Sequence, residues 1–114
     1  MRLTSEFWTS ALSRRVFAAG GFAAVLKRGA AEAGAIFVMV RGRDGAVALY
    51  GPAPQGVYET GRPSERAFLR LPVTTLEEAE SKLKREQRFD SDLWVVEIEP
   101  GRTVVEELFP VTPA

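Results

Sequence analysis

Runs of apolar residues divide the chain into short strands with a helix near each end. Residues 35–41 form a continuous apolar run rich in β-branched and aromatic types, which predicts a central strand covered on both faces. Asp44 and Gly45 then predict a tight turn, and the alternation over residues 46–50 predicts a returning strand. Residues 35–50 are therefore expected to form a hairpin.

A first helix is predicted before this hairpin. Trp8, Leu12 and Val16 stand four residues apart, which places their side chains on one face of a helix. The glycine pair at 20–21 predicts a break after it, because each glycine inside a helix costs about 1 kcal/mol. Residues 22–27 then fit either a further strand or the tail of the helix.

The clearest helix signal begins at Thr75. Thr75 and Glu78 form a capping box, in which each side chain pairs with the backbone N–H of the other residue. Acidic residues occupy the first turns and basic residues the last, which matches the helix dipole. Residues 89–92 end the helix, and residues 93–99 alternate as a strand with Trp94 on its apolar face.

The remaining segments have weaker patterns. Residues 51–63 hold three Pro and three Gly without periodicity, which predicts a loop long enough to have a binding role. Residues 66–71 alternate as a strand. The Pro-Gly pair at 100–101 predicts a type II turn, residues 103–109 a final strand, and residues 110–114 a loose tail.

This order of elements predicts a single α+β domain over residues 1–109. We expect one mostly antiparallel sheet of five to seven strands, with two helices packed on one face. The length of 114 residues fits one domain. The hydrophobic content of 46% and the charged content of 26% are typical of a soluble globular protein.

The composition excludes several kinds of chemistry. The chain has no His, Cys or Asn, so an imidazole base, a thiol nucleophile and a zinc finger are all excluded. No catalytic residue set stands out, and no cofactor or metal is expected. We therefore predict a small non-enzymatic binding or assembly module that engages a protein partner or a second copy of itself, because its strands must end in sheet edges available for pairing.

One alternative is a nucleic-acid-associated protein. Residues 1–50 hold seven basic and three acidic residues, and residues 51–114 hold eight and twelve, so the balanced total hides an asymmetry. Arg66, Phe68 and Arg70 share one strand face, where an aromatic ring between guanidinium groups would stack a base. The competing interpretation places Phe68 under a helix, with the arginine stems lying over it.

A second alternative is a carboxylate-based metal site or enzyme around Asp90, Asp92 and Glu97. Carboxylates at a helix-to-strand junction can bind a divalent cation or act as an acid-base pair. The competing interpretation is that both Asp side chains make local turn hydrogen bonds. The candidate binding residues of all these hypotheses are Arg14, Arg15, Arg28, Tyr50, Arg66, Phe68, Arg70, Asp90, Asp92 and Trp94.

The N-terminal segment contains a twin-arginine pattern. Ser13-Arg14-Arg15-Val16-Phe17, followed by an apolar stretch and an Ala-Glu-Ala sequence at 31–33, resembles an export signal. The same arginines fit the solvated side of the predicted helix, and we favour that interpretation. The apolar stretch at 16–26 is shorter than the ~20 residues that span a bilayer. We expect a cytoplasmic protein without a membrane role.

Several short segments resemble a family of short alphaproteobacterial proteins known only as a domain of unknown function. The segments are Phe7-Trp8-Thr9-Ser10-Ala11, Ala33-Gly34-Ala35, Leu49-Tyr50-Gly51-Pro52-Ala53-Pro54 and Phe89-Asp90-Ser91-Asp92-Leu93-Trp94-Val95-Val96-Glu97. The similarity covers most of residues 2–99, and the last segment is its most specific part. It implies a cytoplasmic bacterial protein, and it brings no activity and no assigned site residues.

Overall fold

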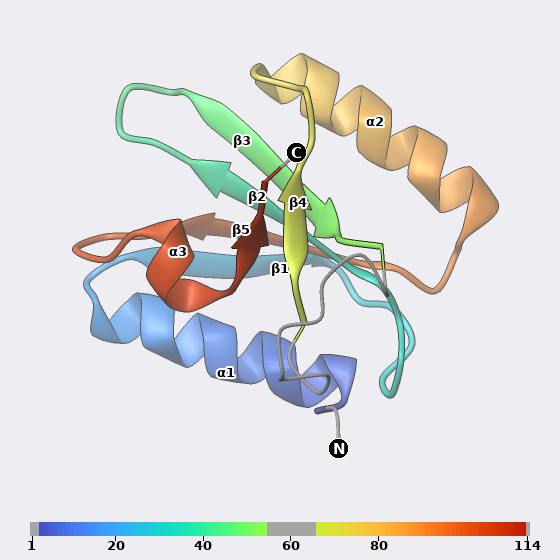
Figure 1. The fold of residues 1–114 in the computed structure, drawn as a ribbon, viewed down its shortest axis with the longest axis horizontal. Coiled ribbons are helices and arrows are strands. Elements are labelled where there is room, and N and C mark those ends of the chain that lie inside the picture. Colours follow the sequence, from blue (N-terminus) through green and yellow to red (C-terminus); the bar gives the residue numbers. More distant parts are fainter. Residues whose placement is uncertain (1–2, 55–65, 114) are drawn as a thin grey trace.

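A single six-stranded sheet organises the fold (Figure 1). The computed structural model describes residues 3–54 and 66–113. The elements in chain order are α1 (Ser5–Ala18), β1 (Phe22–Lys27), β2 (Ile36–Arg41), β3 (Val47–Pro52), β4 (Phe68–Arg70), α2 (Leu76–Phe89), β5 (Trp94–Glu99), α3 (Val105–Leu108) and β6 (Val111–Thr112). The strand order across the sheet is β1-β5-β2-β3-β4-β6.

The sheet is mixed but mostly antiparallel. Neighbouring strands pair antiparallel between β1 and β5, β2 and β3, and β3 and β4, whereas β2 with β5 and β4 with β6 are parallel. The predicted α+β class with a single mostly antiparallel sheet is therefore confirmed. The predicted hairpin over 35–50 is also confirmed, with Val38 opposite Tyr50 and the Asp44 carboxylate accepting a hydrogen bond from the Ala46 N–H.

The placement of the helices on one face of the sheet is wrong. α1 and α3 lie on one face and α2 on the other (Figure 1). Leu12 and Val16 of α1 pack into a core with Val96, whereas Leu83 of α2 packs into a separate core with Val95. The physical reason is the central strand β2: residues 36–39 are all buried, so apolar side chains on both faces need cover.

Each of the two predicted helices begins with a side-chain cap. The Thr4 hydroxyl accepts a hydrogen bond from the Phe7 N–H at the start of α1. The predicted capping box at α2 is confirmed, and hydrogen bonds from the backbone of Thr74 and Thr75 lower the pKa of the Glu78 carboxyl. The segment after α1 is a strand, β1, which settles the alternative left open by the sequence.

The C-terminal segment differs from the prediction. Residues 103–109 contain the short helix α3 in place of a strand, and Val111–Thr112 forms β6 parallel to β4 in place of a loose tail. The reason is an aromatic cluster that the local pattern does not show. The ring of Phe109 lies 4.5 Å from that of Phe68 and 5.6 Å from that of Tyr50, so burial of Phe109 directs the chain back to the sheet.

Two further predictions concern loops. Gly101 has a φ of +70°, which agrees with the glycine position of the predicted turn. Most of the predicted loop at 51–63 lies outside the described residues, which exclude 55–65. Its first two residues belong to β3, which extends to Pro52.

Candidate functional site

The ten candidate residues do not form one site. Arg14, Arg28 and Trp94 line one surface pocket between α1 and β1, which we term the α1–β1 pocket. Arg66, Phe68 and Asp90 line a second pocket of about 250 Å³ beside β4. The other four candidates line neither of these two pockets; they are Arg15, Tyr50, Arg70 and Asp92.

The α1–β1 pocket has a volume of about 270 Å³ and combines hydroxyl, guanidinium and apolar groups. Its lining residues are Thr9, Ser10, Ser13, Arg14, Val25, Arg28 and Trp94. Four of them come from α1, where the spacing 9, 10, 13 and 14 places them along one side of the helix. Val25 comes from β1, the strand at the edge of the sheet. The pocket therefore opens beside an edge strand.

Arg28 is held in place by two contacts. Its guanidinium carbon lies 5.0 Å from the centre of the Trp94 ring, a cation–π arrangement, and its Nη2 forms an ion pair with the Glu6 carboxylate of α1. The Trp94 indole N–H in turn donates a hydrogen bond to the Ala30 carbonyl at 2.8 Å. The position of this cation is thus set by the packing of β5 and α1.

The loop after Arg28 approaches the start of β5 too closely for side chains. A Cβ added at Gly29 would lie 2.1 Å from the Asp92 carbonyl oxygen, and one added at Gly34 would lie 2.3 Å from the same atom. The Ala30 N–H donates a hydrogen bond to this carbonyl at 2.9 Å. The two glycines therefore allow the backbone contact that positions Arg28 over Trp94.

Three of the polar side chains in the pocket, those of Thr9, Ser10 and Arg14, have no hydrogen-bond partner among residues 3–54 and 66–113. Thr9 is 2% exposed, and its hydroxyl is buried with no hydrogen-bond partner in residues 3–54 and 66–113. Arg14 is exposed, and within these residues no hydrogen bond or ion pair engages its guanidinium. Ser13 differs, because its hydroxyl donates to the Thr9 carbonyl at 2.9 Å. The pocket thus offers unused hydrogen-bond donors.

The face predicted to stack a nucleic-acid base is not available at β4. Phe68 is 1% exposed and packs against the ring of Trp8 of α1 at 5.2 Å, so a base cannot stack on it. Arg66 is 8% exposed, and its Nη2 donates hydrogen bonds to the Leu3 carbonyl at 2.9 Å and to the Ser5 hydroxyl at 3.1 Å. This agrees with the competing interpretation, in which Phe68 lies under a helix.

Ser5 links the N-terminus of α1 to the neighbouring loop. Its side chain is fully buried, and its hydroxyl donates to the Gly34 carbonyl at 2.6 Å while accepting from Arg66. We expect Ser5→Ala to lower the free energy of unfolding by about 1–3 kcal/mol, because it removes the hydroxyl that donates to the buried Gly34 carbonyl and one of the hydrogen bonds that Arg66 donates. Urea denaturation measures this, with the exposed Ser81→Ala of α2 as control. Equal stability of the two variants would contradict the role of the Ser5 hydroxyl in linking α1 to the loop at Gly34.

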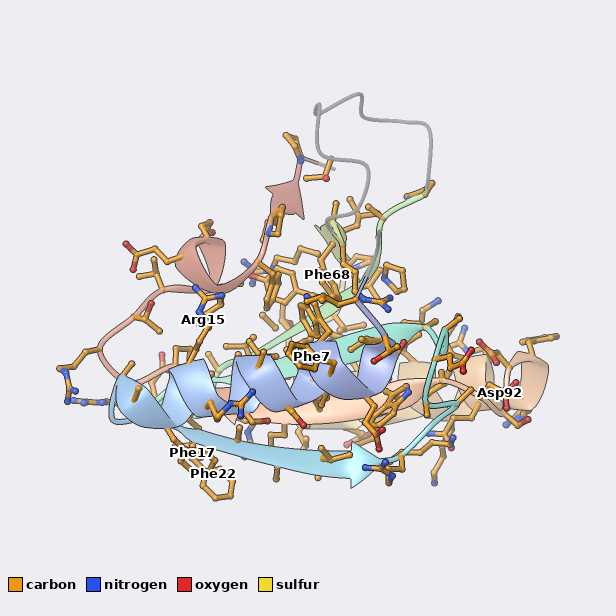
Figure 2. The ribbon with its side chains drawn as sticks, turned by 90° about the horizontal axis from the view of Figure 1, so that it is seen from below. Phe7, Arg15, Phe17, Phe22, Phe68 and Asp92 are labelled. Carbon is orange, nitrogen blue, oxygen red and sulfur yellow. The ribbon has the colours of Figure 1, made fainter. Side chains whose placement is uncertain are left out.

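Arg15 and Tyr50 have structural contacts. The Arg15 guanidinium donates to the Leu108 carbonyl at 2.8 Å and to the Glu107 carbonyl, which holds α3 against α1 (Figure 2). Tyr50 is 5% exposed and belongs to the core on the α1 face of the sheet. Burial raises the pKa of its hydroxyl, and the nearby Arg70 guanidinium offsets this shift in part.

The acidic residues at the junction of α2 and β5 make a local turn. The Asp90 carboxylate accepts a hydrogen bond from the Asp92 N–H at 2.9 Å, and Asp92 itself is exposed. Glu97 lies on β5, where it pairs with Arg41 at 3.3 Å. Within residues 3–54 and 66–113, no three His, Cys, Asp or Glu side chains gather in a group that would hold a metal ion.

Sequence reasoning did not identify the hydroxyl residues of the pocket. Thr9, Ser10 and Ser13 lie beside the apolar residues of α1. Their spacing places them on one side of the predicted helix, and this spacing is a signal that could have identified them. Exposed apolar residues near β1 were also missed. They are Phe17, Phe22, Val25 and Leu26. No signal in the sequence separates such residues from those that enter the core.

The fold and the pocket define a small α+β protein with a cationic surface pocket beside an edge strand. The chain belongs to a family of proteins of unknown function, DUF1491, whose family model matches residues 3–105. This confirms the resemblance that the sequence motifs indicate. No curated protein matches the chain.

Solved structures of related proteins share the fold. The solution structure of a protein from A. tumefaciens is 53% identical, with a TM-score of 0.84 over 100% of this chain and 98% of that one. The crystal structure of a DUF1491 family protein from Caulobacter crescentus CB15 is 30% identical, with a TM-score of 0.77 over 98% of this chain and 100% of that one.

None of the helices in the described ranges has the length and apolar character that a membrane-spanning helix needs.

Proposed function

We propose that this protein is a cytoplasmic binding module that engages an extended segment of another protein, or of a second copy of itself, along the outer edge of β1. The observation that supports this most directly is the unpaired edge of β1 beside a group of exposed apolar side chains. The two features together match the requirements of β-strand addition, in which backbone hydrogen bonds join the segment to the sheet and side chains set the specificity.

The edge of β1 is long enough to accept a strand. β1 has six residues and pairs with β5 on one side, and its other side has no strand neighbour among the described residues. The strand at the opposite edge of the sheet, β6, has only two residues. Proteins usually protect a long edge strand, because its free N–H and C=O groups pair readily with other chains.

Apolar side chains surround this edge. Phe22, Val25 and Leu26 of β1 are 48%, 42% and 53% exposed, which is unusual for three large apolar residues on one six-residue strand. Phe17, at the end of α1, is 52% exposed and contacts Phe22 edge to face, with ring centres 6.0 Å apart (Figure 2). Burial of these side chains by a partner would contribute favourable free energy, at about 25 cal/mol per Å² of apolar area.

The test compares two exposed apolar positions. We expect Leu26→Lys, which adds a charge at the β1 edge, to abolish the retention of partner proteins from a bacterial extract or the self-association measured by light scattering. The control is Val104→Lys, because Val104 is 54% exposed and lies outside the sheet. Both variants should unfold within about 0.5 kcal/mol of the unchanged protein, since they alter the surface only.

Two results would refute the proposed function. The first is a protein that stays monomeric at all concentrations and retains no partner that Leu26→Lys releases. The second is equal loss of binding in both variants, because the loss would then not depend on β1. A self-associated form that Leu26→Lys alone dissociates would identify the second copy as the partner.

A further inference from the structure

The α1–β1 pocket opens next to the strand that the proposed function uses for docking. We propose that this pocket binds the carboxylate of an Asp or Glu side chain carried by the protein segment that docks on β1. The inference rests on the proposed function for the source of the carboxylate, while its chemistry rests on the pocket alone. It assigns a ligand group to Arg14, Arg28 and Thr9.

The charge of the pocket favours a single negative group. Arg14 and Arg28 contribute two positive charges, and the ion pair between Arg28 and Glu6 uses one of them. One positive charge is therefore left uncompensated, at the unpartnered Arg14. A guanidinium matches the geometry of a carboxylate, because two parallel N–H groups can donate to its two oxygens.

The hydroxyl of Thr9 is an independent indication of a ligand. A buried hydroxyl without a partner costs free energy, so such groups are rare in folded proteins and need an explanation. Thr9 is 2% exposed, lines the pocket, and has no hydrogen-bond partner in the part of the chain that the structure describes. The hydroxyl oxygen is buried in this conformation, and rotation of the side chain about χ1 would turn it toward a carboxylate in the pocket, which would accept its hydrogen bond.

The position of the pocket suits the side chain of an added strand. Val25 of β1 lines the pocket, and Ala23, two residues before it, points to the same face of the sheet as α1. A segment paired with β1 would direct alternate side chains toward that face. One of these would enter between α1 and β1, where the pocket volume of about 270 Å³ is ample for a carboxylate side chain.

The experiment uses two peptides that differ in one group. Both are blocked five-residue peptides of alternating Val and Thr around a central residue, which is Glu in one and Gln in the other. We expect the Glu peptide to cause saturable shifts in the amide resonances of Ser10, Ser13 and Val25 and to bind about tenfold more tightly than the Gln peptide. The factor corresponds to a charge-assisted hydrogen-bonded pair.

Three variants test the assignment to residues. Arg14→Gln is expected to remove the difference between the peptides, whereas Arg43→Gln, at the exposed β2–β3 turn, is expected to leave it unchanged. Thr9→Val is expected to weaken binding of the Glu peptide while keeping or raising the melting temperature, because it removes an unsatisfied hydroxyl. A purely structural role of Thr9 would not weaken binding at unchanged stability.

The outcomes separate this proposal from the proposed function. Equal binding of both peptides, with shifts along β1, would refute the carboxylate pocket and leave docking on β1 intact. Binding of neither peptide would refute the pocket as a site for a segment's side chain. If the Glu peptide bound no more tightly than sodium acetate, with the same Arg14-dependent shifts, the source would be a free carboxylate and the assignment to a docking segment would be wrong.

Discussion

Trp94→Ala is expected to be among the most destabilising single substitutions in this protein, lowering the free energy of unfolding by about 3–5 kcal/mol. Trp94 is 1% exposed and belongs to the core on the α1 face of the sheet. Its removal leaves a large cavity, and it also removes the hydrogen bond from the indole N–H to the Ala30 carbonyl and the ring beneath Arg28.

The control for this substitution is Phe89→Ala. Phe89 is also aromatic, but it is 86% exposed at the end of α2, so its loss should change stability by less than about 0.5 kcal/mol. Urea denaturation of the two variants gives the comparison. A third variant, Trp94→Phe, keeps an aromatic ring and loses the indole N–H, and we expect it to have an intermediate stability. Similar stabilities of the two alanine variants would contradict the burial of Trp94 in the core.

Gly29→Ala is expected to lower the free energy of unfolding by about 3 kcal/mol although it adds a single methyl group. That methyl group would lie 2.1 Å from the Asp92 carbonyl oxygen and 2.5 Å from the Leu93 carbonyl oxygen. Both are backbone atoms of the segment that begins β5, so the clash cannot be relieved by turning a side chain and the loop must move. The move would also displace Arg28 from Trp94.

A second glycine shows whether the loss of stability in Gly29→Ala comes from the steric clash or from the backbone conformation. Gly45 has a φ of +85° and no atom within 4 Å of an added Cβ, so Gly45→Ala is expected to cost only about 1 kcal/mol of conformational strain. Thermal unfolding of both variants measures the difference. A Gly29→Ala protein as stable as Gly45→Ala would show that the loop at 28–34 does not require the close approach.

The sequence predicted best those features that depend on a few neighbouring residues. Thr75 and Glu78 identified the start of α2, because a capping box involves atoms within one helical turn. Asp44 and Gly45 identified the turn between β2 and β3 for the same reason. The family resemblance also rested on short local segments, and the match over residues 3–105 confirmed it.

Features that depend on distant contacts were predicted less well. The turn at 100–101 indicated a returning strand over residues 103–109, but the contact of Phe109 with Phe68 required a different path. The helices were placed on one face of the sheet, although the buried residues 36–39 of β2 need cover on both. For both the segment 103–109 and the placement of the helices, the local sequence was compatible with two structures. Packing between segments far apart in the chain selected one of them.

In the candidate site, too, the features that depend on distant contacts were not predicted. Arg14, Arg28 and Trp94 were chosen as separate candidates, and nothing in their spacing indicated that they share a pocket. Phe68 was a candidate for stacking, but α1 covers it. Thr9 was not a candidate at all, because only burial makes its hydroxyl unusual.

The sequence by itself determined the class of fold, the positions of α1 and α2 and the hairpin of β2 and β3, because capping, turn geometry and periodicity act over a few residues. The tertiary structure alone decided which faces are covered, which strand is left at the edge, and which polar groups meet between α1 and β1. The physical reason is that burial and pairing depend on residues far apart in the chain, as Ser5 and Gly34 or Arg28 and Trp94 are here.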